Sequence, residues 1–337
     1  MNGKHIRWSI FIIIMLLLLV VSAAFSLIRG EVNLSLRDLP SILREANSME
    51  YYILEKIRIP RMVLAFSTGG ALSLAGAVLQ GIYRNPLVEP YTLGISGGAA
   101  LGVALVIVTG LHITVGSLMM PLAGFAGAFA TIFLVYFLSI KRGGIEINRM
   151  LLIGVMISFI ASSSVMFLMS VTASENLHGI VFWMMGSLDE PNSYLIRIMV
   201  AISVGGLLVT YLFARPLNAL RLGESRARHL GINTTLSVRV LFITCSLLAG
   251  ASVAVAGVIG FVGLVIPHVI RLIIGSDYRI LLLGSFLGGS VFLMISDLIA
   301  RTIISPNELP IGVITGIIGG AAFIIVLSNQ RKNTQRL

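Results

Sequence analysis

The stretch Arg221–Asn233 reads RLGESRARHLGIN and gathers three arginines, a glutamate and a histidine between two long apolar runs. The neighbouring runs, about 193–213 and about 235–257, each have close to the roughly 20 residues that a helix needs to cross a bilayer. Most of the rest of the chain avoids charge. The stretch therefore predicts a polar segment beside the membrane, held between two membrane-spanning helices.

This polar segment has the features of a short helix. Gly223 and Gly231 bracket it, and Gly231 can end a helix in the left-handed conformation. Glu224 and Arg228 are spaced to pair on a helix. We predict a helix of about two turns whose small and apolar residues fall on one face: Ala227 and Leu230. The alternative is a solvated loop, which explains the arginines but not the small and apolar face.

The composition places the chain in a bilayer. Its 337 residues are 57% hydrophobic and 11% charged, whereas soluble domains carry about a quarter charged residues. We predict an all-α polytopic membrane protein with about ten spans. The eighth predicted span is short and is interrupted by Gly260, Gly263 and Pro267. The predicted spans are about 9–29, 61–82, 92–110, 116–139, 149–171, 193–213, 235–257, 261–274, 278–301 and 310–328.

The net charge of +10 has an uneven distribution. With ten spans, most Lys and Arg residues fall in the loops on the side of the two termini. This is the pattern of the positive-inside rule, so both termini and the segment at 221–233 are predicted to be cytoplasmic. The rule accounts for the basic charge without a nucleic acid partner. The single cysteine, Cys245, allows no internal disulfide.

The first external loop, about 30–60, is an exception because it also carries several basic residues. Apolar residues recur in it at helical spacing, and Asp38 and Pro40 suit the start of a helix. We predict an amphipathic helix lying on the outer face. An interfacial connector with no further role is the alternative.

Glycines spaced by four positions predict close packing of helices in lipid. Packing is a sufficient explanation for all of them, so they indicate a tight bundle and no particular function. These glycines are Gly94, Gly98 and Gly102, then Gly284 and Gly288, then Gly312, Gly316 and Gly320.

Common motifs of catalysis and metal binding are missing from the sequence. No stretch matches G-x-x-x-x-G-K-[ST] or H-E-x-x-H, and the five histidines are scattered. The only adjacent acids, Asp189 and Glu190, fall in an external loop. We therefore predict no catalytic residue, no bound cofactor and no metal site, which makes a membrane-embedded enzyme an unfavoured alternative.

An ion-coupled secondary transporter is also unfavoured. Such carriers keep acids or histidines near the bilayer midplane. The best candidate here is Asp297, four residues before Arg301 and near an external helix end, where an i,i+4 pair would stabilise the helix. The sequence thus shows no evident site for ATP or for a coupling ion, which indicates that a partner supplies the energy.

Several separated motifs, in order, resemble those of the integral membrane permeases of binding-protein-dependent ABC importers for iron–siderophores, haem and cobalamin, the large ten-span type. The resemblance covers nearly the whole length. The motifs are IRIPRMVLAFSTGGALSLAGAVLQGIYRNPLVEPYTLGISGGA (57–99), WMMGSL (183–188), LGESRARHLGIN (222–233), GVIGFVGLVIPHVIRLIIGSDYR (257–279) and SDLIART with ELPIGVITGIIGG (296–320).

The resemblance implies one transmembrane permease domain over 1–337, in the cytoplasmic (inner) membrane of a bacterium. It implies three partners besides membrane lipid: a cytoplasmic ATPase dimer, an extracytoplasmic substrate-binding protein, and a second permease copy, identical or related. ATP hydrolysis would belong to the ATPase. Ferric siderophore is the predicted cargo, with cobalamin or haem as the alternative, and no residue was identified that reads the cargo.

The resemblance also implies roles for residues in the polar segment. They would form a coupling helix that docks into a groove of the ATPase. The implied coupling residues are Gly223, Glu224, Arg226, Ala227, Arg228, Leu230 and Gly231. Many relatives have a second acid after the first, whereas Ser225 stands here, so the detailed contact with the ATPase is open.

Further residues match positions of the family at the outer face and along the pathway. Arg58, Arg61 and Arg301 would receive glutamates of the binding protein, an arrangement that steers docking; snorkelling at a helix end is the alternative. Asn85 and Leu87 would form a cytoplasmic gate, or a tight structural turn. The pathway-lining helix would present Ser162, Ser163 and Ser164, which could equally be hydrogen-bonding glue between helices.

Overall fold

The computed structural model describes residues 2–30, 42, 44, 48–116, 118–141, 144–190 and 192–334. Within these ranges nearly every element is a helix. The exceptions are two short antiparallel strands between α7 and α8, β1 (Ile140–Lys141) and β2 (Gly144–Ile145). The helices are α1 (Asn2–Ile28), α3 (Met49–Tyr52), the π-helix η1 (Ile53–Arg58), α4 (Ile59–Tyr83), the 3₁₀-helix η2 (Pro90–Leu93), α5 (Ile95–Val108), α6 (Leu111–Val115), α7 (Met119–Leu138), α8 (Ile147–Val171), α9 (Ser174–Met185), α10 (Ser193–Leu212), α11 (Ala214–Leu220), α12 (Glu224–His229), α13 (Thr234–Ala256), α14 (Val262–Ile274), α15 (Tyr278–Thr302) and α16 (Ile311–Thr334).

The predicted all-α polytopic fold is confirmed. In the part of the chain that the structure describes, seven helices are long and apolar enough to cross a membrane, and each covers a predicted span. The other three predicted spans coincide with shorter apolar helices, Ile95–Val108, Val262–Ile274 and Ile311–Ile325. The helices therefore agree with the ten predicted spans in order and position, although α5 (Ile95–Val108) is shorter than the predicted span 92–110.

Helix α4 forms the centre of the bundle. From Leu64 to Tyr83 nearly every residue is buried, and the helix packs against α10, α13, α14 and α15. Small residues make this possible: a Cβ on Gly69 would overlap the backbone of Gly289, and one on Gly76 would overlap that of Gly263. The helix backbones therefore touch, as the small-residue content of the sequence predicts.

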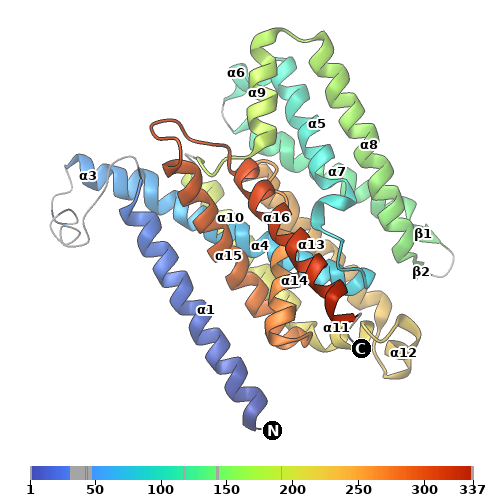
Figure 1. Ribbon diagram of the computed structural model, residues 1–337. Helices are drawn as coiled ribbons and strands as arrows, with labels where there is room; N and C mark the ends of the chain where they lie inside the picture. The colour runs from blue at the N-terminus through green and yellow to red at the C-terminus, as the bar shows by residue number, and fades with distance from the viewer. Residues whose placement is uncertain are drawn as a thin grey trace.

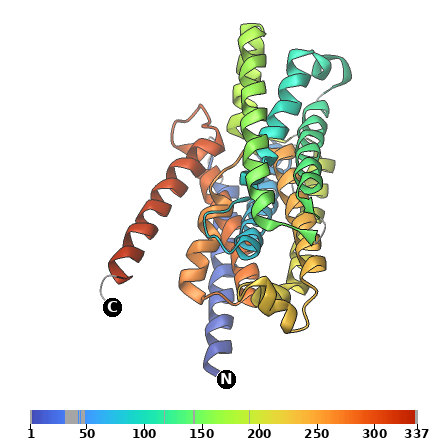
Figure 2. The same ribbon diagram turned by 90° about the vertical axis from the view of Figure 1, so that its right-hand side faces the viewer.

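A second group of helices lies beside this centre. Helices α5, α7 and α8 pack together, and α6 and α9 lie at their upper end in Figure 1. Helix α1 runs along α15 on the opposite side. Figure 2 shows α16 diverging from the bundle toward the C-terminus, and its residues Ile317 and Ile324 are 66% and 69% exposed.

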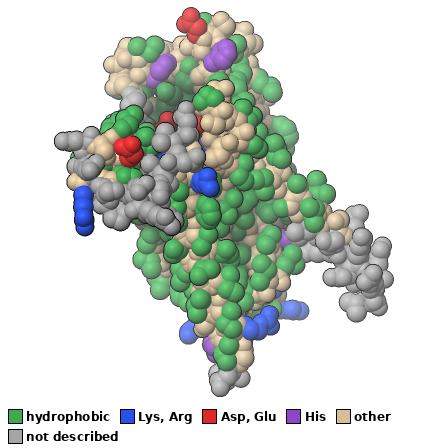
Figure 3. All heavy atoms as spheres, turned by 60° about the vertical axis from the view of Figure 1, so that its left-hand side comes forward, with side chains coloured by type: hydrophobic (Ala, Val, Ile, Leu, Met, Phe, Trp, Pro, Cys, Tyr) green, Lys and Arg blue, Asp and Glu red, His purple; other side chains and the backbone are tan. Residues whose placement is uncertain are grey.

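Charge is concentrated at the ends of the molecule. Figure 3 shows apolar side chains over the body and Lys and Arg side chains gathered at its lower end. Figure 1 shows both termini at the end that carries α12, which we name the α12 end. Since an even number of spans returns the chain to its starting side, this arrangement fits the ten predicted spans; which side is cytoplasmic stays a prediction.

About half of the predicted external amphipathic helix at about 30–60 lies outside the described residues. From Met49 the chain is helical through η1 into α4, and Leu54 is buried against Leu27 and Ile42. Asp38 and Pro40 fall outside the described residues, so the helix start predicted there stays a prediction. Helices α9 and α11 were not anticipated from the sequence.

Candidate functional site

The polar segment at the α12 end contains a helix of six residues. Gly223 precedes it with a φ of 108° and Gly231 follows with a φ of 80°, a region that side chains disfavour. The Arg228 Nη2 donates to Glu224 Oε1 at 2.6 Å, and the Arg228 Nε donates to Thr234 Oγ1 at 3.0 Å. The predicted i,i+4 pair is therefore present, and it also holds α12 against the first turn of α13.

Ala227 and Leu230, which the sequence predicts on one face, differ in burial. Ala227 is fully buried, whereas Leu230 is 64% exposed. The helix ends at His229, and the amide of Ile232 donates to the carbonyl of Ala227. The segment thus has an anchored inner side and an exposed outer side that includes Leu230, Arg226 and Leu222.

A polar cluster around Asp277 ties α1, α11 and α15 together at the same end. Asp277 accepts from Lys4 Nζ at 3.1 Å and from Asn218 Nδ2 at 3.0 Å, while Asn218 Oδ1 accepts from the Tyr278 amide at 3.0 Å. Burial raises the pKa of the Asp277 carboxyl, but the hydrogen bonds from Asn218, the Arg279 amide and Lys4 outweigh it and lower the pKa below its ordinary value. The carboxylate form is therefore favoured.

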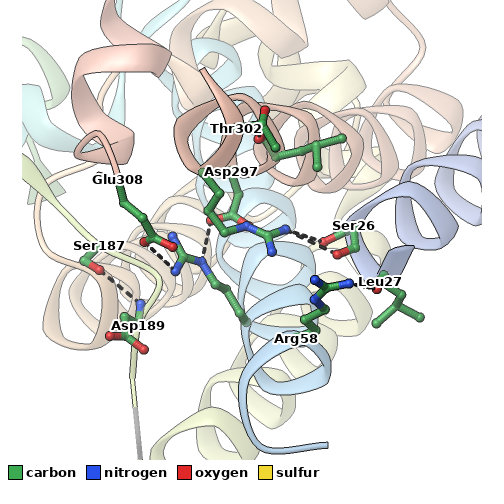
Figure 4. Close-up of polar contacts among 11 residues, drawn as sticks. Ser26, Leu27, Arg58, Ser187, Asp189, Asp297, Thr302 and Glu308 are labelled. Atoms are coloured by element: carbon green, nitrogen blue, oxygen red, sulfur yellow. Dashed lines mark hydrogen bonds and ion pairs between the residues drawn. The ribbon is translucent and has the colours of Figure 1, made fainter. Parts of the chain in front are cut away.

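At the opposite end, a buried ion network surrounds Asp297 (Figure 4). Asp297 Oδ1 lies 2.8 Å from Arg61 Nε, and its Oδ2 lies 3.0 Å from Arg301 Nε. Arg61 Nη1 also lies 2.8 Å from Glu308 Oε2 in the segment before α16. Asp297 is fully buried, and Arg61 and Arg301 are each 7% exposed, so one carboxylate serves two buried cations.

The same network reaches the end of α1. Arg301 Nη2 donates to the Ser26 carbonyl at 3.3 Å and to Ser26 Oγ at 3.2 Å. Arg58 Nη1 donates to the carbonyls of Leu27 and Ile28 at 2.5 and 2.9 Å, which is the favourable placement of a cation at a helix C-terminus. Figure 4 shows Arg58 turned toward α1 rather than outward.

The arginines expected at the outer face are thus brought together, and they have partners within this chain. Arg58 is 3% exposed, and the exposed member of the network is Glu308, whose side chain is 49% exposed. Sequence reasoning identified Arg58, Arg61, Arg301 and Asp297 but missed Glu308. No local signal marks Glu308, because its partner Arg61 is 247 positions away.

The RNPLVEP stretch at 84–90 makes a turn in contact with the interrupted segment before α14. Asn85 Oδ1 accepts from the Leu87 amide at 2.9 Å, and Leu87 is 53% exposed. Glu89 Oε2 accepts from the Phe261 amide at 3.3 Å. Phe261 itself has a φ of 70°, which is rare for a residue with a bulky side chain, so the carboxylate supports a strained position.

This turn also approaches the polar segment and α14. Arg84 ends α4 with a φ of 52°, and its Nη1 would lie 3.6 Å from a Cβ on Gly223. Gln80 Nε2 donates to the carbonyls of Gly263 and Leu264, each at 3.2 Å, and Gln80 Oε1 accepts from Arg271. Asn85 and Leu87 therefore lie on a turn connected both to α12 and to the break in the eighth predicted span.

Two of the serines expected along the pathway are exposed. Ser162 and Ser163 are exposed, and Ser164 is partly buried with its Oγ donating to the Ile160 carbonyl at 2.9 Å. Ser163 and Ser164 line an open groove of about 610 Å³ between α5 and α8. The hydrogen bond of Ser164 stays within its own helix, so among the described residues it gives no support to the interhelical alternative.

Comparisons with known proteins agree with this architecture. The model of the FecCD transport family matches residues 15–329. The haemin transport system permease protein HmuU of Yersinia pestis is 36% identical over 334 residues, covering 98% of this chain and 99% of HmuU. The vitamin B12 import system permease protein BtuC of Shigella boydii is 34% identical over 332 residues, covering 98% and 97%.

A solved structure is also similar. It is an inward-facing conformation of a metal-chelate type ABC transporter, with a TM-score of 0.83 and 32% identity, covering 94% of this chain and 98% of that one. The fold and the comparisons define a multi-pass membrane protein of the ABC importer permease class. The chain belongs to the FecCD transport family.

Proposed function

We propose that this permease moves ferric siderophore inward across the cytoplasmic membrane of a bacterium, driven by a separate ATPase dimer. The whole chain, 1–337, would be one permease domain, with both termini and the α12 end in the cytoplasm. The chain itself performs no chemistry on the cargo. Basic side chains at the α12 end support this orientation, because they are retained on the cytoplasmic side.

The observation that carries the proposal is the construction of α12. Its inner side is fixed by buried Ala227 and by the contacts of Arg228 with Glu224 and Thr234. Its outer side leaves apolar and basic residues exposed where a partner could bind them. A force applied to the segment Gly223–Gly231 would therefore pass directly into α13, as a coupling helix requires.

The outer face would receive a substrate-binding protein near Arg58, Arg61 and Arg301. Because these guanidinium groups are buried and paired, carboxylates of that protein could not simply add to free charges. They would exchange with Glu308, whose half-exposed carboxylate occupies the accessible side of Arg61. Docking would then act on the segment that leads into α16. The Arg61–Glu308 pair would thereby link the binding of the substrate-binding protein to a movement of this segment.

The pathway would lie between this chain and a second permease copy. Helix α8 has exposed Ser162 and Ser163, and α16 has exposed Ile317 beside Gly316, whose Cβ would meet nothing within 4 Å. These surfaces are suited to a partner helix at close range. Asn85 and Leu87 would close the cytoplasmic side of such a pathway.

The cargo is the finer part of the proposal. Haem is the second candidate, favoured by 36% identity over 98% of the chain with a permease named for haemin transport, and cobalamin is the third. All three compounds are metal chelates, the class named for the similar solved structure. The permease would be reconstituted in proteoliposomes with its ATPase and binding protein, and uptake of each labelled chelate would be measured at equal concentration.

ATP-dependent uptake of ferric siderophore in preference to haem and cobalamin is expected. Preferential uptake of haem or cobalamin would change the proposed cargo but would still support an importer. Uptake driven by an ion gradient with no ATPase present would overturn the importer proposal itself. Omitting the binding protein in a parallel preparation separates its contribution from that of the ATPase.

A further inference from the structure

An apolar groove lies between α7 and α13, away from the two polar ends. Its volume is about 370 Å³. Phe125, Phe129 and Tyr136 line it from α7, and Phe242, Ile243 and Gly250 line it from α13. Because Phe129 and Ile243 are 60% and 55% exposed on helices that span the membrane, the groove opens toward the hydrocarbon of the bilayer.

The dimensions of the groove fit one hydrocarbon chain. From Phe125 to Tyr136, α7 rises about 17 Å, which is close to half of the roughly 30 Å hydrocarbon core and so to the depth of one leaflet. Dividing the volume by this length gives a mean cross-section of about 20 Å². The groove is therefore a long, narrow slot that suits an unbranched chain.

The walls of the groove are pre-formed. The Tyr136 and Phe242 rings stack with centroids 6.3 Å apart at 24°, and the Phe125 and Phe129 rings stack at 6.5 Å and 19°. The groove has depth at Gly250 because a Cβ there would meet nothing closer than the Ala128 methyl group at 3.7 Å. A ligand would therefore enter a shaped site without rearranging its walls.

A cation stands at one end of the groove. Arg239 is exposed and precedes Phe242 and Ile243 by three and four positions, so it lies on the same face of α13, one turn beyond the groove. It is in the second turn of α13, which begins at Thr234 directly after the polar segment. The cation therefore lies toward the α12 end, where Lys and Arg side chains gather (Figure 3).

We propose that this groove binds one acyl chain of an anionic phospholipid from the leaflet at the α12 end, with Arg239 contacting the headgroup phosphate. The arrangement of an apolar slot one leaflet deep, ending at an exposed arginine, matches the two parts of such a lipid. The site is separate from the cargo pathway and does not depend on which chelate the permease carries.

The test uses the full-length chain in nanodiscs with photoactivatable phospholipids that carry a diazirine on one acyl chain. Crosslinks are mapped by peptide mass spectrometry. Phosphatidylglycerol should label 125–136 and 242–250 about fivefold more than phosphatidylcholine, the factor that one Lys or Arg near the surface contributes toward anionic lipid. Arg239→Gln should abolish this preference, whereas Arg279→Gln, at another exposed arginine of the α12 end, should keep it.

A second variant tests the slot itself. Gly250→Leu should fill the groove and reduce its labelling severalfold, while Gly205→Leu on α10, where a Cβ meets nothing within 4 Å, should leave it unchanged. Equal labelling by the two lipids in the wild type would overturn the proposal, as would labelling spread evenly over all lipid-facing helices. Crosslinks between two copies of the chain at the groove would also overturn it. If Gly250→Leu does not fold, the comparison of Arg239→Gln with Arg279→Gln still tests the proposal.

Discussion

Arg61 and Asp297, 236 positions apart in the chain, are joined by a 2.8 Å contact between Nε and Oδ1. The contact fastens α4, the central helix, to α15, and Arg301 lies on the other oxygen of the same carboxylate. A single buried carboxylate between two buried guanidinium groups leaves a net positive charge inside the protein. Glu308 reduces that charge from the exposed side, which makes the segment before α16 part of the same electrostatic unit.

Asp297→Asn should destabilise the permease strongly. Removing one partner of a buried ion pair leaves the other charge uncompensated and costs about 3–5 kcal/mol. Here Arg301 loses its ion pair with Asp297, and Arg61 keeps the half-exposed Glu308. Thermal unfolding of the purified protein in detergent should show a large drop in the transition temperature. Glu308→Gln removes a carboxylate that is 49% exposed and should cost only about 1 kcal/mol or less.

Equal losses for Asp297→Asn and Glu308→Gln would contradict this account, since they would show that burial of the carboxylate does not matter. A double variant, Asp297→Asn with Arg301→Met, should recover part of the lost stability. It removes the Arg301 charge, whose ion pair with Asp297 is lost, and keeps a side chain of similar length.

The sequence predicted the spans well because each depends on local composition. Charge-poor runs of span length identify α1, α7 and α13 without tertiary information. It also placed Asp297 and Arg301 as an i,i+4 pair, and the pair is confirmed. The contact with Arg61 could not be predicted, because it depends on how α4 and α15 pack, and a single sequence carries no signal for it.

Glycine spacing illustrates the same limit. Gly98, Gly102 and Gly312 do allow close backbone contacts, as predicted. Gly94, in contrast, has a φ of 85° at the start of α5, and a Cβ on Gly316 would meet nothing within 4 Å. Close packing is still present at Gly94, where a Cβ would lie 2.9 Å from the Gly154 carbonyl oxygen. Among the described residues of this single chain, packing does not account for Gly316, because spacing alone does not reveal which helix face is covered.

Gly76→Ala should destabilise the bundle although alanine is the better helix former. In an exposed helix the change would gain about 0.5–1 kcal/mol, but here the new methyl group would overlap the backbone of Gly263 and force α4 and α14 apart. Gly205→Ala on α10 is the matched control, with open space at its Cβ, and should be neutral or slightly stabilising. Chemical denaturation of both variants measures the difference, and a stable Gly76→Ala would show that the two helices are less closely packed than described.

Arg226→Glu should uncouple transport from ATP hydrolysis. Arg226 is exposed on α12, so reversing its charge changes the proposed ATPase contact without disturbing the anchored inner side. Uptake should fall about tenfold, which corresponds to about 1.4 kcal/mol of lost interaction, with unchanged thermal stability. Arg279→Glu, at the same end of the molecule but on α15, is the control and should keep most of the activity. A similar loss in both variants would indicate a general charge effect and remove the special role of α12.

Asp277→Asn should weaken the attachment of α1 and α11 to α15, and the effect should depend on pH in a defined direction. The pKa of Asp277 in the folded protein is below its ordinary value of 3.8, so the carboxylate stabilises the fold above that value and the stabilisation is lost as pH falls through the lower, folded-state pKa. At neutral pH the variant should be less stable than the wild type by about 1 kcal/mol, because the side chain is partly exposed. The difference should begin to shrink as pH falls below about 3.8, and it should vanish only below the folded-state pKa. Unfolding curves between pH 3 and pH 7 measure this, with Asp189→Asn, an exposed acid outside the cluster, as the control. A difference that stays constant from pH 7 to pH 3 would show that the asparagine changes the packing around Asn218 and not the charge.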